Sequence, residues 1–412
     1  MRNMKDSGIE WVGEIPSTWG VGRIGGLYSL RNQKVSDRDY PPLSVTNKGI
    51  LPQLETAAKS NAHDDRKLVR IGDFAINSRS DRRGSCGISP YEGSVSLINT
   101  ILAPNTEMVP QYYDWLFHTI QFGDEFYKWG HGIVDDLWTT GWQDMKKILI
   151  PVPSIEEQKA IAHFLDGKCA EIDATVSEIE SQIASLELFK RSVVTETVTK
   201  GLDCDAQMID SGIQWIGMMP SHWRIIRGKY ILTYRQKPVR EDDGVITCFR
   251  DGEVTLRSNR REEGFTMSDK EIGYQGIDVG DLVVHGMDGF AGSIGISDSR
   301  GKASPVLNVL DTKQNKRYIM YYLRSMAYSD VFLALATGIR VRSCDLRWNK
   351  LAELSYPVPP LDEQEAIVNH IDTIIEKTDA VIFDKKAQLQ TLDEYKKSII
   401  FEYVTGKKEV CA

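Results

Sequence analysis

The strongest constraint on the fold of this chain is an internal repeat with a period of about 205 residues. Residues 4–19 read MKDSGIEWVGEIPSTW and residues 208–223 read MIDSGIQWIGMMPSHW, with ten of the sixteen positions identical. We call this segment the Trp motif, because both copies carry two tryptophans in register. A second match joins residues 151–161, PVPSIEEQKAI, to residues 357–367, PVPPLDEQEAI. The chain is therefore expected to fold as two similar halves.

Between these matched ends the halves diverge, and only a few framework features recur. Gly72-Asp73 matches Gly280-Asp281, and the glycine-containing segment 84–89 matches 292–297. The length of 412 residues suits two or three domains. We predict a variable domain followed by a long helix in each half, with boundaries at 1–150, 151–203, 204–356 and 357–412.

The two repeated segments after the variable domains are predicted to be long helices. Ser154 and Glu157 form a capping box at the start of the first helix. Apolar residues then recur at alternating steps of three and four from Leu165 to Val193, and the second copy repeats this pattern. Heptads sustained over so many turns are typical of a coiled coil. A helix of about 45 residues is roughly 65–70 Å long.

We interpret the two helices as an antiparallel coiled coil, in which the recurring Lys190 and Lys396 help to fix the register. The alternative is a pair of ordinary amphipathic core helices. The predicted fold class is α+β (mixed α/β): two similar variable domains, separated by two long helices, with an internal pseudo-twofold repeat.

Charge is distributed unevenly along the chain. The formal net charge is −8, but the two predicted helices account for −4 and −5, whereas residues 220–261 carry +5. Such local basic patches suit phosphate contact in places and do not suit a strong nonspecific polyanion binder. No apolar run approaches the roughly 18 residues of a membrane span, and the N-terminus lacks a signal-peptide core. We expect a cytoplasmic protein that does not associate with a membrane.

The motifs of common enzyme chemistry are missing from the sequence. There is no GxxxxGK[ST], GxGxxG, GxSxG or [DN]PP[YF], and none of the seven histidines recurs at its repeat-equivalent position. The six cysteines are too scattered for a disulfide framework or a zinc site. We therefore expect no catalytic residues, no metal and no cofactor in this chain.

The combined motifs identify a resemblance. The pattern D-S-G-I-x-W-x-G-x-x-P-x-x-W, the boundary P-V-P-x-x-x-E-Q and a long helix closing on V-T all occur twice. Together they resemble the DNA specificity subunit of type I restriction-modification enzymes, over essentially the whole chain. The resemblance implies that each variable domain is a target-recognition domain for double-stranded DNA, spaced by the repeated helices.

The resemblance also implies the partners. Two modification subunits would supply adenine methylation with S-adenosylmethionine, and two restriction subunits would supply ATP- and Mg-dependent translocation and cleavage. This chain would be non-catalytic by itself and would read an asymmetric, two-part DNA site. A scaffold that gathers two partner enzymes without reading DNA is the alternative, and a self-sufficient enzyme is a third.

Candidate contact residues follow from the chemistry of base edges, where Arg or Lys suits guanine and Asn or Gln suits adenine. The first domain offers Asn47, Lys48, Arg79, Arg82, Arg83 and His131. The second domain offers Arg235, Lys237, Arg250, Arg257, Arg260, Arg261, His285, Arg340 and Arg342. Each could instead be a solvated surface charge. For partner docking we expect residues at the start of each helix, namely Glu157, Gln158, Glu363 and Gln364. The tryptophans of the Trp motif are expected to be packing anchors rather than exposed stacking platforms.

Overall fold

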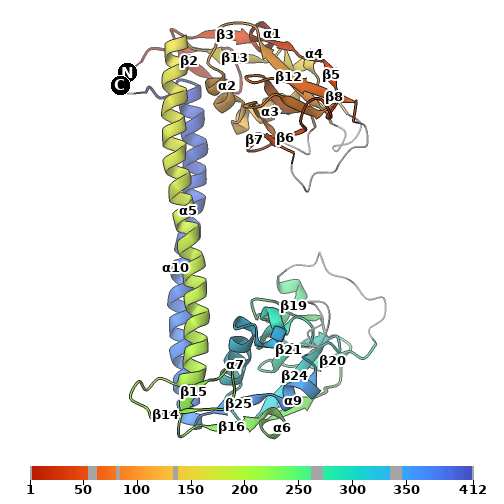
Figure 1. Cartoon of the computed structure of the whole chain (residues 1–412), viewed down its shortest axis with the longest axis vertical. Coiled ribbons are helices and arrows are strands. Elements are labelled where there is room, and N and C mark those ends of the chain that lie inside the picture. Colours follow the sequence, from red (N-terminus) through yellow and green to blue (C-terminus); the bar gives the residue numbers. More distant parts are fainter. Residues whose placement is uncertain are drawn as a thin grey trace. The chain divides into compact units, whose positions relative to one another are not determined.

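The computed structural model describes residues 2–53, 63–79, 84–132, 138–260, 272–334 and 346–410. Its internal contacts divide the chain into two compact units. Unit 1 comprises Met1–Ile179 with Lys386–Ala412, and unit 2 comprises Glu180–Lys385 (Figure 1). Each unit therefore holds one variable domain, the first part of one long helix and the last part of the other.

The domain of unit 1 is built mainly from short antiparallel strands. Its largest sheets have the orders β10-β9-β12-β4 and β11-β8-β5, and the pairs β1-β2, β3-β13 and β6-β7 complete the domain. The elements are β1 (Met4–Asp6), β2 (Glu14–Pro16), β3 (Gly20–Arg23), α1 (Ile24–Leu27), β4 (Tyr28–Leu30), β5 (Lys34–Val35), β6 (Leu43–Thr46), β7 (Gly49–Pro52), β8 (Arg66–Val69), β9 (Phe74–Asn77), β10 (Cys86–Ile88), β11 (Gly93–Ser96), β12 (Asn99–Pro104), α2 (Pro110–Phe117), α3 (Ile120–Lys128), α4 (Trp142–Met145) and β13 (Leu149–Val152).

The domain of unit 2 repeats this plan. Its main sheet has the order β17-β24-β21-β22, which corresponds to β4-β12-β9-β10 of unit 1. The elements are β14 (Met208–Asp210), β15 (Met218–Pro220), β16 (Arg224–Arg227), α6 (Gly228–Ile231), β17 (Leu232–Arg235), β18 (Ile246–Cys248), β19 (Val254–Leu256), η3 (Arg257–Asn259), β20 (Gln275–Ile277), β21 (Leu282–His285), η4 (Gly289–Ala291), β22 (Ile294–Ile296), β23 (Gly301–Ala303), β24 (Leu307–Thr312), α7 (Lys316–Tyr328), α8 (Val331–Ala334), α9 (Trp348–Glu353) and β25 (Ser355–Val358).

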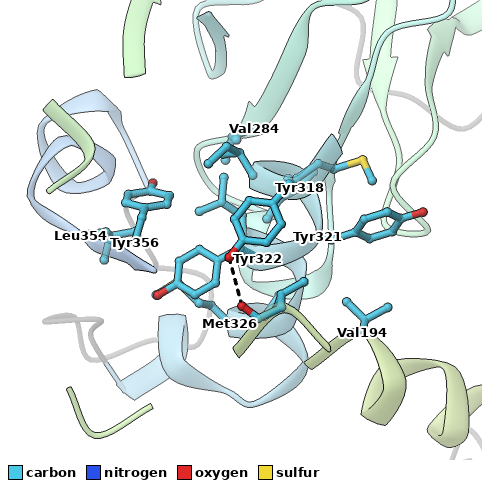
Figure 2. Close-up of a cluster of buried hydrophobic side chains, with 14 of the residues drawn as sticks. Val194, Val284, Tyr318, Tyr321, Tyr322, Met326, Leu354 and Tyr356 are labelled. Carbon is cyan, nitrogen blue, oxygen red and sulfur yellow. Dashed lines mark hydrogen bonds between the residues drawn. The ribbon is translucent and has the colours of Figure 1, made fainter. Parts of the chain in front are cut away.

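Aromatic residues of the helices form the core against one face of each main sheet. In unit 2, Tyr318 and Tyr322 of α7 pack with Val284 of β21 and with Tyr356 of β25 (Figure 2). The rings of Tyr322 and Tyr356 lie 5.3 Å apart, and both side chains are buried. Burial of several large aromatic rings supplies much of the hydrophobic stabilisation of a small domain. The aromatic stripe of these helices is thus core.

The two long helices are α5 (Ile155–Lys200) and α10 (Leu361–Val404). Both begin a few residues after the recurring PVP, because Leu149–Val152 pairs with β3 and Ser355–Val358 pairs with β16. The capping box is confirmed, since Ser154 Oγ accepts from the Glu157 backbone N–H and Glu157 Oε2 accepts from the Ser154 N–H, both at 3.3 Å. No helix among the described residues combines the length and apolarity that crossing a membrane requires.

In each unit the two helices run antiparallel, as predicted. In unit 1, Lys396 Nζ lies 2.6 Å from Asp173 Oδ1, and in unit 2, Lys190 Nζ lies 2.5 Å from Asp379 Oδ1. Both the lysine and the aspartate are repeat-equivalent between the halves, so one ion pair occurs twice. Their role in fixing the register remains a prediction, and we expect them to add little stability, because an exposed ion pair is worth about 0–1 kcal/mol.

Candidate nucleic-acid interface

The Trp motif joins each domain to both long helices. In unit 1, the buried Trp19 donates from Nε1 to Glu157 Oε1 at 3.0 Å, near the start of α5. Its ring also closes on Gly406, just beyond the end of α10, where an added Cβ would lie 2.9 Å from Trp19 Cη2. Tyr112 OH completes the join by donating to the carbonyl of Val404 at 2.7 Å. The motif therefore fixes two helix ends at once.

Unit 2 repeats the same join with the helices exchanged. Trp223 Nε1 donates to Glu363 Oε1 at 3.0 Å near the start of α10, and Tyr318 OH donates to the Val198 carbonyl at 3.1 Å near the end of α5. Gly201 lies against Trp223 and adopts a φ of +76°, which favours glycine at a helix end. Residues that are identical in the two halves thus connect each domain to the long helices. The packing role expected for these tryptophans holds for Trp19 and Trp223.

The two glutamines chosen for partner docking lie inside these joins. Gln158 is 2 % exposed and Gln364 is 0 % exposed. Gln364 Oε1 accepts from the Asn315 N–H at 2.9 Å, and its amide donates to the Pro359 carbonyl at 2.8 Å. Gln158 makes the corresponding bonds to the Val109 N–H and the Pro153 carbonyl. Burial places both glutamines out of a partner's reach, whereas docking through Glu157 and Glu363 remains a prediction.

Replacing Gln364 by alanine is expected to lower the free energy of unfolding of unit 2 by about 1–3 kcal/mol, because the Asn315 N–H loses its acceptor inside the protein. Chemical denaturation monitored by hydrogen exchange around residue 315 would measure the loss. The matched control is Gln390→Ala, an exposed glutamine of α10 that bonds Glu394. A Gln364 variant as stable as this control would show that the buried amide is dispensable.

A β-hairpin turn in each domain carries predicted contact residues. In unit 1, Asn47 and Lys48 form the two-residue turn between β6 and β7, where Thr46 pairs with Gly49, and both are exposed. In unit 2, Arg250 lies in the turn between β18 and β19, and its guanidinium is 3.2 Å from Asp288 Oδ1. The two turns occupy equivalent places in the two domains.

Two further predicted residues of unit 1 flank Thr139 on opposite sides, next to the end of β9. His131 exchanges backbone hydrogen bonds with Thr139, at 2.9 and 3.1 Å, and Arg79 forms an isolated bridge with the same Thr139. The backbone of Arg79 is held further by Tyr127 OH, which donates to its carbonyl at 3.0 Å. In unit 2, Leu346 donates to the Gly286 carbonyl at 2.8 Å in the same position. Arg79 and His131 are therefore held on either side of Thr139, and their backbone positions are fixed by the fold.

Other predicted residues of unit 2 are tied into ion pairs of the domain itself. Lys237 lies 2.7 Å from Asp278 and 2.6 Å from Asp281, and Arg300 lies 2.6 Å from the same Asp278. Hydrogen bonds from Lys237 and Arg300 outweigh burial and hold the pKa of Asp278 at about 2. Arg235 is 3.1 Å from Asp311. These contacts give Lys237 a structural role, so it is a weaker candidate for DNA contact than the sequence suggested.

The two described arginines after β19 contact the β18-β19 hairpin. Arg260 is 4.2 Å above the Phe249 ring and 2.5 Å from Asp251, so its guanidinium is aligned by both an aromatic face and a carboxylate. Arg257 Nε lies 3.4 Å from Thr247 Oγ1. The remaining predicted contacts lie outside the described residues, namely Arg82, Arg83, Arg261, Arg340 and Arg342.

His285 is held as a neutral side chain at the end of β21. Its Nδ1 accepts from the backbone N–H groups of Met287 at 3.2 Å and Asp288 at 2.9 Å. Burial lowers its pKa below the ordinary value of 6.5; the charge of Asp288 opposes this shift and that of Arg250 adds to it. A neutral ring with Nδ1 as acceptor presents Nε2–H as a donor.

We expect the stability of unit 2 to fall as the pH drops below 6.5. The unfolded chain then binds a proton at His285 more readily than the folded chain does, and protonation of Nδ1 removes two hydrogen bonds. Titration of the His285 ring nitrogens by nuclear magnetic resonance should give a pKa below 6.5 with the proton on Nε2. A pKa at or above 6.5 would contradict the geometry.

The fold defines a class of proteins in which two similar β-rich domains are each joined to both helices of an antiparallel pair. No family model matches the chain. It is 22 % identical over 435 residues to a putative type I restriction enzyme MjaX specificity subunit of Methanocaldococcus jannaschii, covering 97 % of this chain and 96 % of that protein. It is also 22 % identical over 274 residues to the type I restriction enzyme StySPI specificity subunit of Salmonella potsdam, covering 63 % and 58 %.

Solved structures give the same result for the fold. A chain from a study of assembly and conformational transition of a type I R-M system matches with a TM-score of 0.71 and 13 % identity, covering 96 % of this chain and 99 % of that one. The HsdS subunit from Thermoanaerobacter tengcongensis matches with a TM-score of 0.53 and 16 % identity, covering 96 % and 98 %. The resemblance to type I specificity subunits, predicted from the repeated motifs, is confirmed.

Proposed function

We propose that this chain is the DNA sequence-specificity subunit of a type I restriction-modification complex, and that each domain reads one half of an asymmetric, two-part site. One observation carries the proposal most directly. The two domains share a framework and a join to the helices, yet their equivalent hairpin turns present different side chains, Asn47-Lys48 in one and Arg250 in the other. Two readers of different sequence need this combination of a common scaffold and unlike contact groups.

The remaining parts of the proposal concern the assembly. The helices would set the separation of the half-sites and dock two modification subunits, which in turn recruit two restriction subunits. S-adenosylmethionine, ATP and Mg would bind those partners, and the chain itself would be non-catalytic. The complex would act on cellular DNA in the cytoplasm. The duplicated architecture supports this stoichiometry, because two like ends suit two copies of one partner.

Methylation mapping tests the proposed function. The chain and its modification subunit would be expressed in cells without other adenine methylation, and N6-methyladenine would be located by single-molecule sequencing. Methylation at one asymmetric two-part motif is expected, and deletion of this chain alone should abolish it. Exchanging residues 24–147 for the corresponding segment of another such chain should change one half of the motif only.

An unchanged methylation pattern without this chain, with the modification subunit shown to be active, would refute the specificity role. The alternative of a scaffold that does not read DNA predicts such a pattern. It also predicts that exchange of the variable segment leaves the motif unchanged.

A further inference from the structure

A recurring glycine in each domain allows a hairpin to pack directly against the strand that contains the glycine. Gly87 lies in β10, and an added Cβ there would be 2.8 Å from the Cα of Gly49, the residue of β7 that directly follows the turn. Gly295 lies in the equivalent strand β22, and an added Cβ there would be 1.9 Å from the carbonyl oxygen of Gly252. Real Cβ atoms do not approach backbone this closely. In both units the turn therefore rests directly on an edge strand of the main sheet.

The packing position on the edge strand is the same in both units, but the two turns differ in length and in their side chains. In unit 1, Asn47 and Lys48 span two residues, and Thr46 Oγ1 fixes the turn by accepting from the Lys48 N–H at 3.1 Å. In unit 2, the Phe249 N–H donates to the Glu253 carbonyl at 2.8 Å and closes a longer turn around Arg250. The backbone of each turn is thus held by a hydrogen bond, and the polar side chains of the turn are exposed. A fixed backbone suits selection of a ligand better than nonspecific attraction.

The outward side chains have the chemistry of base readout. In the major groove, Asn can form two hydrogen bonds with the edge of adenine, and Arg or Lys can do so with the edge of guanine. Arg250 has 64 % of its side chain exposed, and its ion pair with Asp288 is long, at 3.2 Å. A guanine edge can replace such a partner at small cost, because an exposed ion pair contributes little. The equivalent turns of the two domains therefore present different hydrogen-bond donors and acceptors.

We propose that these two turns, Asn47-Lys48 and Arg250, select bases in the two halves of the DNA site, with Gly87 and Gly295 as positioning residues beneath them. The inference rests on the proposed function and makes it specific to two short segments. Loss of a turn side chain should change which bases are accepted in one half, and the other half should remain as it was.

The experiment uses the full chain with its modification subunit and maps N6-methyladenine in cells. The Asn47→Ala/Lys48→Ala variant should accept new bases in one half of the motif, and Arg250→Ala should do so in the other half. Methylation of the original site should fall about tenfold to a hundredfold relative to relaxed sites, the usual discrimination of a paired base contact. Control variants are Lys5→Ala and Arg227→Ala; Arg227 has 59 % of its side chain exposed and pairs with Glu353, so it matches Arg250 closely.

The positioning residues are tested separately. Gly87→Ala should relax the same half as Asn47→Ala/Lys48→Ala, because its Cβ displaces the turn without removing a contact side chain. Gly123→Ala is the matched control, since Gly123 lies in α3 with nothing within 4 Å of an added Cβ and no positive φ. Thermal unfolding of each variant establishes that it remains folded, and the surface variants of the turns keep the test valid if Gly87→Ala does not fold.

Each outcome is decisive. A shift confined to one half supports the inference. The same motif methylated at a uniformly lower level would mean that the turns contact only the DNA backbone, and an unchanged motif would mean that they do not contact DNA; either result overturns the inference and leaves the proposed function standing. Absence of any two-part motif with the unaltered chain would instead refute the proposed function.

Discussion

Replacing Trp19 by alanine is expected to lower the free energy of unfolding of unit 1 by about 3–5 kcal/mol, the usual cost of removing a buried tryptophan. The side chain is 1 % exposed and fixes Glu157 near the start of α5 and Gly406 beyond the end of α10. Because one ring holds two helix ends, its loss should release both. Trp223→Ala should have the same effect on unit 2.

Hydrogen exchange followed by mass spectrometry would measure this, because it reports on each unit separately in a chain that need not unfold in one step. In Trp19→Ala, exchange should rise at residues 400–410 and in the Trp motif of unit 1, and unit 2 should stay protected. Tyr230→Ala is the control, since Tyr230 is 75 % exposed. Equal protection of residues 400–410 in both variants would show that the join does not depend on this ring.

Residues 1–203 produced alone are expected to form a homodimer. This fragment retains the first domain and α5 but lacks α10 and the second domain, so apolar residues of α5 such as Val194 and Val198, now buried in the core of unit 2, lose their cover. A second copy can supply it, because the ion pairs Lys190–Asp379 and Lys396–Asp173 are repeat-equivalent. In the dimer, Lys190 of each copy would meet Asp173 of the other, and the Val198 carbonyl would accept from Tyr112 as it now accepts from Tyr318.

Sedimentation equilibrium at micromolar concentration would give the mass of the fragment. Lys190→Asp should weaken the dimer, because each substitution places two carboxylates together and the symmetric interface contains the change twice. The double variant Lys190→Asp/Asp173→Lys should restore it by reversing both pairs. A fragment that stays monomeric and folded at all concentrations would contradict the prediction.

The long helices could be predicted from the sequence because their signals are local. The capping box at Ser154 and the heptads define where α5 begins and which face is buried. The strand that precedes the helix could not be predicted in the same way, because Leu149–Val152 pairs with Gly20–Arg23. That pairing spans more than a hundred residues of chain, and no local pattern contains it.

The candidate site was less predictable because charge chemistry alone does not reveal partners distant in sequence. Lys237 carries the positive charge expected of a DNA contact, yet its amine donates hydrogen bonds to Asp278 and Asp281. Gln158 and Gln364 stand out in the sequence as repeated polar residues. Only the fold shows that both amides form hydrogen bonds inside the protein, where a domain meets a long helix. The recurrence of Gly87 and Gly295 is visible in the sequence as a shared framework feature, whereas the hairpin that packs on each glycine is visible only in the fold.

The partition of the helices between the units has a consequence for how such chains can be recombined. Side chains that cross from domain to helix, such as Trp19, Glu157 and Tyr112, have counterparts of the same type at the same contacts in the other half. A chimera spliced within the repeated segments would therefore carry a whole variable domain to a new neighbour with every joining contact intact. New specificities can then arise by shuffling rather than by gradual redesign, because the parts that must fit one another are the parts that do not vary.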